Sequence, residues 1–553
     1  MRVVRLPYSP RWPLLVILIA GVSALIALTY LPSRGSDETG PEPGGTYVEG
    51  VAGEPARVNP LYASFNEVDR DLVALTFSGL MRFGTNGALE PDLVEAMPLT
   101  PDARTYIFQL RSGLSWQDGQ PLTSSDVVFT VKTIQDPNVQ GDPVLADLYR
   151  GVEVSAPDAR TVVMTLPQAF APFLARGATV GILPEHLLSG LDPEDLFDAT
   201  FNLEPVGSGP FRLVELTPSA AVLEPSETYH LGAPLLGRIE LRFFRDDSEL
   251  LNALTTDAVD GALFRPGLDE EDVAFIDDDS RWVRRELHGT PYSLIYLNLQ
   301  SPVFADTQVR RALQQGIDRE ELGRAALKGQ ALFLDSPIVR DMWAYEGDPD
   351  AYAFDQTRAG LLLDASGWEL EGGVRVKDGA PLRFALAASD DPAQAALAHE
   401  LSRQWGELGI EVDVRVSGAS QFVEGVLLPR DFEAALVTID PGPDPDPYPF
   451  WDSAQAFGDG RNLSGYSNER VDTLLENARQ TSSAAERAVA YHEFQEIFAR
   501  DLPAVLLYTQ TYQYAVRAEL QGLSPGLLLS LSSRFEGVQR WHLLGASERD
   551  GEG

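Results

Sequence analysis

Hydrophobic and polar residues follow different periods in the two halves of the chain. In the first half, alternation with a period of two predicts strands at 105–111 and 238–244, and a hairpin over 151–166. The segment 123–134 predicts a helix, because Thr and Ser precede its apolar run and Asp126 falls in the first turn. The first half is therefore predicted to be α+β.

In the second half, strands alternate with longer helices. Strands are predicted at 292–299, 382–389, 410–416 and 434–439. Apolar residues three and four positions apart predict helices, of which 306–327 is taken as one amphipathic helix. The other predicted helices are 357–368, ending at Gly367, and 393–409, 469–480 and 485–501. This order predicts an α/β half with a parallel sheet, and the two halves meet near residue 290.

The N-terminus has the pattern of a membrane helix. Residues 1–12 carry three arginines and no acid, and no charge occurs from Trp12 to Ser33. An α-helix of that length reaches about 33 Å, enough to cross a bilayer core. We expect a cytoplasmic basic flank at 1–12, a transmembrane anchor at 13–32 and a flexible linker at 33–45, with the rest outside the cytoplasm. A cleaved signal sequence is the alternative.

Composition excludes several classes of function. The net charge is −39, which argues against a nucleic-acid partner because phosphates require a basic surface. The chain has no cysteine, so disulfides, thiolate metal sites and a lipidated cysteine are excluded. The sequence contains no phosphate-binding GxxxxGK[ST] motif and no GxSxG nucleophile motif. We therefore expect a binding protein rather than an enzyme, with no cofactor.

Three aspartates stand among prolines after the predicted strand 434–439. They are Asp440, Asp444 and Asp446. A calcium loop would need six or more oxygen ligands and a glycine at its turn, whereas prolines lie between these acids. No metal is therefore predicted. The residues alone leave open whether the acids bind a cationic group or only shape a turn.

A series of segments matches a known family in the same order along the chain. The longest runs over 89–131, and the others include 54–63, 205–216, 296–322 and 465–479. Through these segments the chain resembles the extracytoplasmic solute-binding proteins of ABC transporters, family 5. That family contains dipeptide-, oligopeptide- and nickel-binding proteins.

The resemblance implies a two-lobed, clam-like fold of the type II periplasmic-binding-protein kind, with one α+β lobe and one α/β lobe. The first lobe would hold 46–290, including an inserted subdomain at about 60–190, and would take the chain back at 508–546. The second lobe would hold 291–507, and 547–553 would form a polar tail. The lobes would close on a ligand by a hinge motion.

The resemblance also implies a function. The protein would capture di- or oligopeptides outside the cytoplasm and deliver them to an ABC permease and its ATPase. It would act as a monomer on the extracytoplasmic face of the membrane, held by the N-terminal helix, or periplasmic or secreted if that segment is cleaved. The alternatives are a non-peptide solute (oligosaccharide, nickel chelate or haem) and a surface sensor or scaffold without transport.

For the ligand site, the resemblance points first to Asp440. In peptide-binding members an aspartate at this place pairs with the ligand ammonium, and Asp444 or Asp446 could take that role instead. The remaining candidates come from matching loops and from the predicted crossing between the lobes. They are Trp116, Gly207, Gly209, Tyr296, Asn298, Asn462 and Tyr466. Trp116 is also expected to shape a turn, and the two glycines to allow a close backbone approach.

Overall fold

The computed structural model describes residues 43–544 except 85–86, 99, 101–103 and 349–351. The predicted membrane segment 13–32 and the tail 547–553 lie outside the described residues. Within the described ranges, no helix is both long enough and apolar enough to cross a membrane.

A mixed sheet of eleven strands runs through the described chain in the order β18-β17-β19-β12-β20-β11-β1-β10-β9-β8, with β13 paired to β20. The sheet is divided by its two longest strands, β12 and β20. On one side of them lie β1 (Thr46–Ala52), β8 (Phe211–Leu216), β9 (Ala220–Pro225), β10 (Arg238–Phe244) and β11 (Gly261–Phe264). On the other side lie β13 (Ala331–Phe333), β17 (Arg383–Ser389), β18 (Glu411–Ser417) and β19 (Ala434–Ile439). We call these two sides the first and the second lobe.

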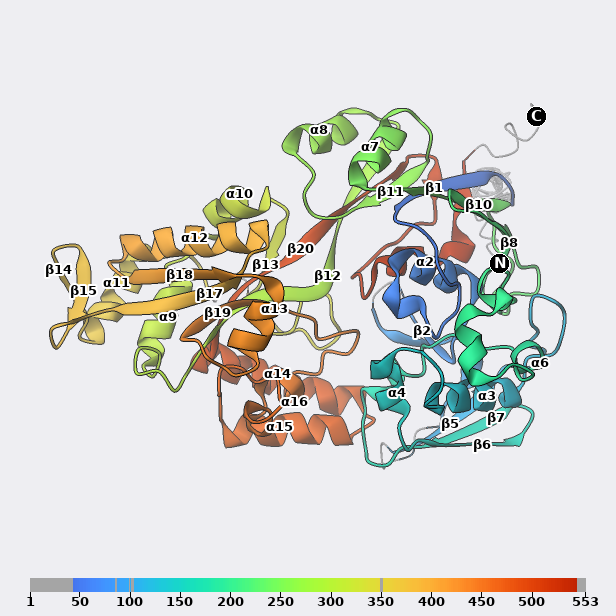
Figure 1. Cartoon of the computed structure of the whole chain (residues 1–553), viewed down its shortest axis with the longest axis horizontal. Coiled ribbons are helices and arrows are strands. Elements are labelled where there is room, and N and C mark those ends of the chain that lie inside the picture. The colour runs from blue at the N-terminus through green and yellow to red at the C-terminus, as the bar shows by residue number, and fades with distance from the viewer. Residues whose placement is uncertain (1–42, 85–86, 99, 101–103, 349–351, 545–553) are drawn as a thin grey trace, which may run out of the picture. The chain divides into compact units, whose positions relative to one another are not determined.

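Two long antiparallel strands connect the lobes. They are β12 (Trp282–Leu297) and β20 (Ala504–Arg517), and Figure 1 shows both passing from one lobe to the other. Their register is interrupted between His288 and Tyr292, where β12 bulges away. On the opposite edge of β20, β13 pairs with residues 508–510 and β11 with residues 513–516.

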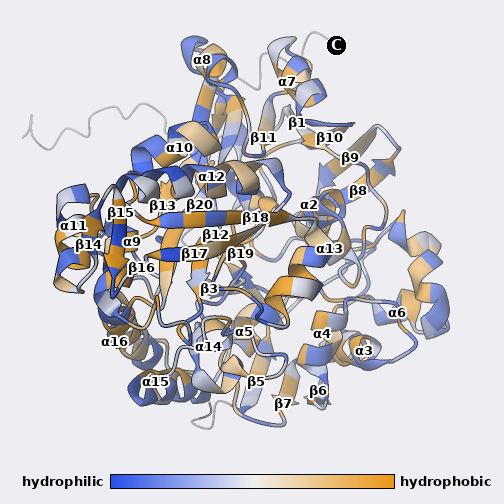
Figure 2. Ribbon diagram, turned by 60° about the vertical axis from the view of Figure 1, so that its left-hand side comes forward, coloured by the Kyte–Doolittle hydropathy of each residue, from blue (hydrophilic) through white to orange (hydrophobic). Residues whose placement is uncertain are grey.

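The second lobe has the predicted alternation of strands and helices. Strand β17 pairs in parallel with β18 and β19, and β19 pairs antiparallel with β12. Helix α12 (Pro392–Glu407) covers this sheet with the buried stripe Leu397, Leu401 and Trp405. Helices α15 (Glu469–Gln480) and α16 (Ala484–Asp501) pack together, and α15 is largely hydrophilic in Figure 2. The α/β prediction for this half is confirmed.

The single helix predicted at 306–327 is wrong. The structure has α9 (Thr307–Gln315) and α10 (Arg319–Leu327) instead. Gly316 ends the first helix, and the carboxylate of Asp318 accepts a hydrogen bond from the Glu321 amide at 3.0 Å to begin the second. The glycine and the capping aspartate break the helix although the apolar spacing continues across them.

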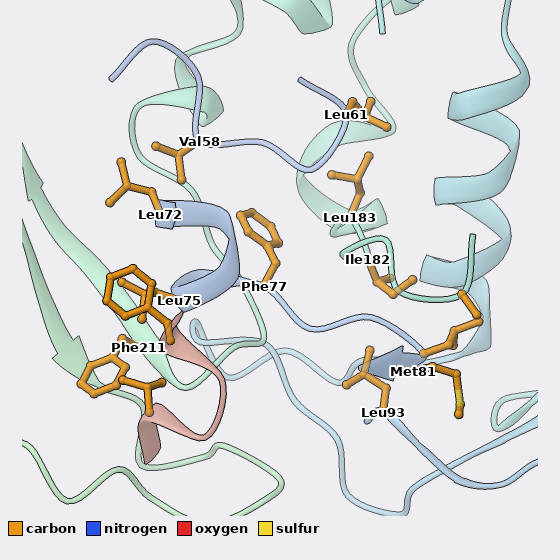
Figure 3. Packing of buried hydrophobic residues seen from close by; sticks show 14 of the residues in the cluster. Val58, Leu61, Leu72, Leu75, Phe77, Met81, Leu93, Ile182, Leu183 and Phe211 are labelled. Atoms are coloured by element: carbon orange, nitrogen blue, oxygen red, sulfur yellow. The ribbon is translucent and has the colours of Figure 1, made fainter. Parts of the chain in front are cut away.

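The first lobe contains a second, separate sheet in the order β4-β5-β7-β6. Its strands are β4 (Val94–Ala96), β5 (Thr105–Leu110), β6 (Glu153–Asp158) and β7 (Thr161–Thr165). Helix α3 (Ser124–Gln135) packs on it and starts with a capping box between Thr123 and Asp126, as predicted. Helix α2 (Glu67–Thr76) joins the main core, where Figure 3 shows Leu75 near Phe211 of β8 and Leu72 near Val58.

Candidate functional site

Asp440 follows the last residue of β19 and lies where the strands cross between the lobes. Its Oδ1 accepts hydrogen bonds from Thr290 Oγ1 at 3.1 Å and from the Gly442 amide at 2.8 Å. Gly442 has a φ of 75°, a conformation that favours glycine. The side chain is exposed, and within the described residues no hydrogen bond reaches Oδ2. One oxygen is therefore held in place while the other is open to an incoming group.

Asp444 and Asp446 stand on the same loop but are buried in ion pairs. Both Asp444 oxygens accept hydrogen bonds from Arg487 of α16, one of them at 3.0 Å. Asp446 Oδ2 accepts from Arg479 of α15, at 2.9 Å from Nε and 2.7 Å from Nη2. The guanidinium of Arg479 also stacks on the Tyr448 ring. These pairs fasten the loop, which we call the proline loop (residues 440–452), to the two helices.

Tyr512 of β20 lies within electrostatic reach of one acid from each lobe, Glu67 and Asp440. Burial raises the pKa of the Tyr512 hydroxyl. The negative charges of Glu67 and Asp440 add to that increase, and the positive charge of Arg265, which lies 3.9 Å from Glu67, opposes it. Glu67 is the exposed first residue of α2 in the first lobe. A narrow crevice beside the crossing is lined by Tyr292, Thr438 and Tyr512 among others, and at about 20 Å³ it has room for a water-sized group only.

The proline loop also touches the first lobe directly. Arg176 Nη2 donates to the Pro441 carbonyl at 3.0 Å, and the Ala171 amide donates to the Arg479 carbonyl at 2.9 Å. Arg479 additionally faces the ring of Phe170. Asp440 thus lies on a loop that is anchored inside its own lobe and contacts the other one.

The comparisons with known proteins decide the family. The model of the bacterial extracellular solute-binding proteins, family 5 (middle region), matches residues 88–460. The chain belongs to this family. It is 31% identical to protein XP55 of Streptomyces lividans, over 92% of this chain and 91% of that protein.

Two further relatives are similar to this solute-binding protein over most of their length. The oligopeptide-binding protein AppA of Bacillus subtilis is 26% identical, over 87% of this chain and 89% of AppA. The structure of NikZ from Campylobacter jejuni in complex with Ni(L-His) is 25% identical, covers 90% of this chain and 99% of its own, and has a TM-score of 0.64. The fold is therefore that of the two-lobed family 5 binding proteins, and the family consists of solute-binding proteins rather than enzymes.

The two candidate glycines of this solute-binding protein approach its own backbone. A Cβ built on Gly207 would lie 1.9 Å from the Thr76 carbonyl oxygen, and one on Gly209 would lie 2.5 Å from the Thr76 carbonyl carbon. The Gly209 amide donates to that same oxygen at 2.7 Å. The close approach expected of these glycines is present, and the partner is the end of α2.

Two of the candidate aromatic residues lie inside the lobes. Trp116 is fully buried and opens a turn in which the Gly119 amide donates to the Trp116 carbonyl at 2.9 Å. Gly119 has a φ of 88°. Tyr296 is also fully buried and packs against Trp451, with ring centroids 5.6 Å apart. Neither side chain is open to a ligand in this structure, and Trp116 has the turn-forming position that the sequence suggested.

The other three candidates hold loops of the second lobe together. Asn298 Nδ2 donates to the Phe432 carbonyl at 3.0 Å, and Asn462 Nδ2 donates to the Tyr466 carbonyl at 2.8 Å. The Tyr466 hydroxyl donates to Asp501 Oδ2 at 2.7 Å. Their polar atoms are used within the protein, so Asp440 is the candidate that remains open.

Sequence reasoning missed Glu67, Thr290 and Tyr512. Glu67 carried only the signal of an acid in the first turn of a helix, and Tyr512 stands in an apolar strand. The proximity of Thr290 and Tyr512 to Asp440 depends on the pairing of β12, β19 and β20, which no local motif encodes. In the described part of the chain, no group of three or more His, Cys, Asp or Glu side chains could hold a metal ion.

Proposed function

We propose that this protein is the peptide-binding component of an ABC importer and that Asp440 receives the ammonium group of the peptide. The observation that carries the proposal is the open Oδ2 of an oriented carboxylate beside the strands that join the lobes. An ammonium buried without a partner would cost several kcal/mol, so a binding site must supply an anion to it. AppA, which is named an oligopeptide-binding protein, supports a peptide ligand.

Closure of the lobes would occur around the crossing of β12 and β20. The interruption at His288–Tyr292 removes ladder hydrogen bonds where bending would concentrate, and Thr509 Oγ1 holds this point by donating to the Gly289 and Pro291 carbonyls. A ligand would then be enclosed between a first-lobe wall near Glu67 and a second-lobe wall at Asp440.

Anchoring and delivery belong to the same proposal. The segment 13–32 would keep the protein on the extracytoplasmic face of the membrane, near a permease and its ATPase. Membrane fractionation together with N-terminal sequencing of the mature protein tests the anchor, because a cleaved signal would give a new N-terminus after residue 32. Crosslinking in the native membrane tests the permease partner.

Thermal unfolding tests the ligand class. The purified protein is heated alone and with a mixture of free-amine di- to nonapeptides, with Ni(L-His), or with an oligosaccharide. At a peptide concentration 100-fold above Kd the stabilisation should be about 2.7 kcal/mol, seen as a raised Tm. A raised Tm with Ni(L-His) only would favour the chelate that NikZ binds. If none of these solutes raised the Tm, a sensor or scaffold would be favoured.

A further inference from the structure

The first lobe contains a cavity of about 400 Å³ that the proposed function leaves without a role. It lies between α2, β2 (Met81–Phe83), the chain at 179–181 and a segment near the C-terminus, which we call the return segment (residues 530–540). Its volume falls in the range of small-molecule sites. The apolar wall residues are Val73, Phe77, Met81, Phe83, Phe535 and Val538.

The walls rest on the main core of the lobe. Phe77 and Met81 belong to the buried cluster drawn in Figure 3, where they lie near Ile182 and Leu93. A cavity whose walls are packed from behind keeps its shape, because side-chain movement would open voids in the core. The cavity is therefore preformed. Polar side chains share the lining with the apolar ones, among them Arg70, Arg82, Asp92 and Glu536.

One acidic side chain in the lining, Glu536, has no cation of its own. Among the described residues no ion pair includes it, and the nearby Arg82 pairs with Glu90 instead. The other acid of the lining, Asp92, is paired with His230 at 2.7 Å. Burial raises the pKa of Glu536 to about 8, although a hydrogen bond with Ser533 and the positive charge of Arg82 act in the opposite direction.

The position of Glu536 is fixed by a buried ion cluster two residues earlier. Arg534 is 2% exposed, and its Nε donates to Glu49 at 2.7 Å while Nη1 donates to Asp71 at 2.9 Å. Glu49 comes from β1 and Asp71 from α2, so the return segment is tied to two elements of the lobe. The Glu536 amide also donates to the Ser533 carbonyl at 3.0 Å. The acid thus stands on a rigid part of the cavity wall.

Two rim residues of the cavity stand close in sequence to residues that contact the proline loop or the crossing strand β12. Thr179 follows Arg176, which donates to the Pro441 carbonyl of the proline loop. Ser530 follows Leu528, whose amide donates to the His288 carbonyl in the crossing strand β12 at 2.9 Å. A ligand held beside Asp440 could therefore extend one of its groups into this cavity.

We propose that the cavity is a subsite for a lysine or arginine side chain of the bound peptide, with Glu536 pairing to its ammonium or guanidinium group. The inference rests on the proposed function and specifies its ligand. A basic side chain has an apolar stem and a charged end, which match the apolar walls and the single carboxyl without a cation. A purely apolar side chain would leave that carboxyl, which has a hydrogen bond with Ser533, without an ion-pair partner.

The test compares lysine with norleucine, which keeps most of the stem but lacks the charge. Isothermal titration calorimetry measures binding of Lys-Ala-Ala, Ala-Lys-Ala, Ala-Ala-Lys and their norleucine counterparts to the full chain at pH 7. For at least one position the lysine peptide should bind at least 10-fold more tightly. Glu536→Gln should remove this preference and leave the norleucine peptide unchanged, while the exposed control Glu215→Gln should keep the preference.

Two further readouts separate a direct contact from a structural effect. Lysine binding should ionise Glu536, so in paired titrations in phosphate and Tris buffers the lysine peptide should release close to one proton more than the norleucine peptide. This difference should vanish in Glu536→Gln. Ala74→Trp, at an exposed lining position, should fill the cavity and weaken the lysine peptide without changing the charge.

The outcomes separate this inference from the proposed function. Binding of peptides with no lysine preference, or a preference that survives in Glu536→Gln, would overturn the subsite and leave peptide binding in place. Failure of every peptide to bind the unmodified chain would overturn both. Loss of the preference in Glu536→Gln with unchanged norleucine binding and an unchanged Tm would establish the subsite.

Discussion

Buried ion pairs hold both the proline loop of the second lobe and the return segment of the first lobe. The proline loop contributes the acids of its pairs, whereas the return segment contributes the arginine. In the proline loop, Asp444 and Asp446 are the loop's own acids, and arginines of α15 and α16 pair with them. In the return segment the arginine, Arg534, belongs to the segment, and the acids come from β1 and α2.

Asp440 in the proline loop and Glu536 in the return segment are acids without an ion pair among the described residues, and the two differ in exposure. Asp440 faces solvent next to the crossing strands, whereas Glu536 is half-buried in a cavity. The difference teaches that the paired charges fix each segment, and under the two proposals above the unpaired acid receives a ligand group. An exposed carboxylate is suited to the charged end of a peptide, and a carboxyl inside an apolar cavity to the end of a long side chain.

Removal of the arginine from the first-lobe cluster should have the largest effect. Arg534→Met leaves Glu49 and Asp71 buried without their positive partner, which typically costs about 3–5 kcal/mol. Urea unfolding measures the free energy of unfolding. The control Arg212→Met breaks an exposed pair with Glu224 and should cost less than about 1 kcal/mol. Equal losses in the two variants would contradict the assigned role of the cluster.

Breaking the buried pair of the proline loop should lower the free energy of unfolding somewhat less. Asp444→Asn leaves the Arg487 guanidinium buried without its carboxylate, although Arg487 keeps a hydrogen bond to the Tyr491 hydroxyl at 3.1 Å. We expect a loss of roughly 3 kcal/mol in the free energy of unfolding by urea. Asp413→Asn, at an exposed pair with Arg415, is the matched control and should change little. A negligible effect of Asp444→Asn would mean that the proline loop is not held by this pair.

The end of the proline loop should show a pH-dependent stability. Burial raises the pKa of Asp452 to about 6, and its Oδ2 is buried without a hydrogen-bond partner. Because the folded pKa exceeds that of the unfolded chain, the neutral form stabilises the fold below about pH 4, and this contribution is lost as the pH rises through 6. Between pH 4 and 7, Asp452→Asn should gain roughly 2 kcal/mol relative to the unmodified chain. If the difference in free energy of unfolding between Asp452→Asn and the unmodified chain were the same at pH 4 and pH 7, the raised pKa of Asp452 would be contradicted.

The comparison of these segments also shows what the sequence could and could not predict. Alternation and capping residues located β5, β17, β18, α3 and α12 because each of these elements is determined by its own residues. The apolar spacing continues across the break between α9 and α10, so spacing alone predicts one helix. Gly316 and Asp318 are the residues that mark the break. These are local errors that local chemistry explains.

The distribution of roles among the acids is a different matter. Asp440, Asp444 and Asp446 look alike in sequence, and only the positions of Arg479 and Arg487 on later helices separate them. Glu536 carries no motif, and its cavity forms from α2, β2 and the return segment, which are far apart in the chain. No short stretch of the sequence indicates which of these distant segments pack together.

Asp440 provides the smallest expected effect and the most direct test of the central claim. Calorimetry compares a tight-binding free-amine peptide with its N-acetylated form on the unmodified chain, on Asp440→Asn and on Asp459→Asn, an exposed control in the same lobe. A lost charge pair of this kind is worth about 1.4 kcal/mol or more, or about 10-fold in Kd. Asp440→Asn should weaken the free-amine peptide by about that factor and leave the acetylated peptide unchanged. Equal changes for both peptides, or no change for either, would contradict the pairing of Asp440 with the ligand ammonium.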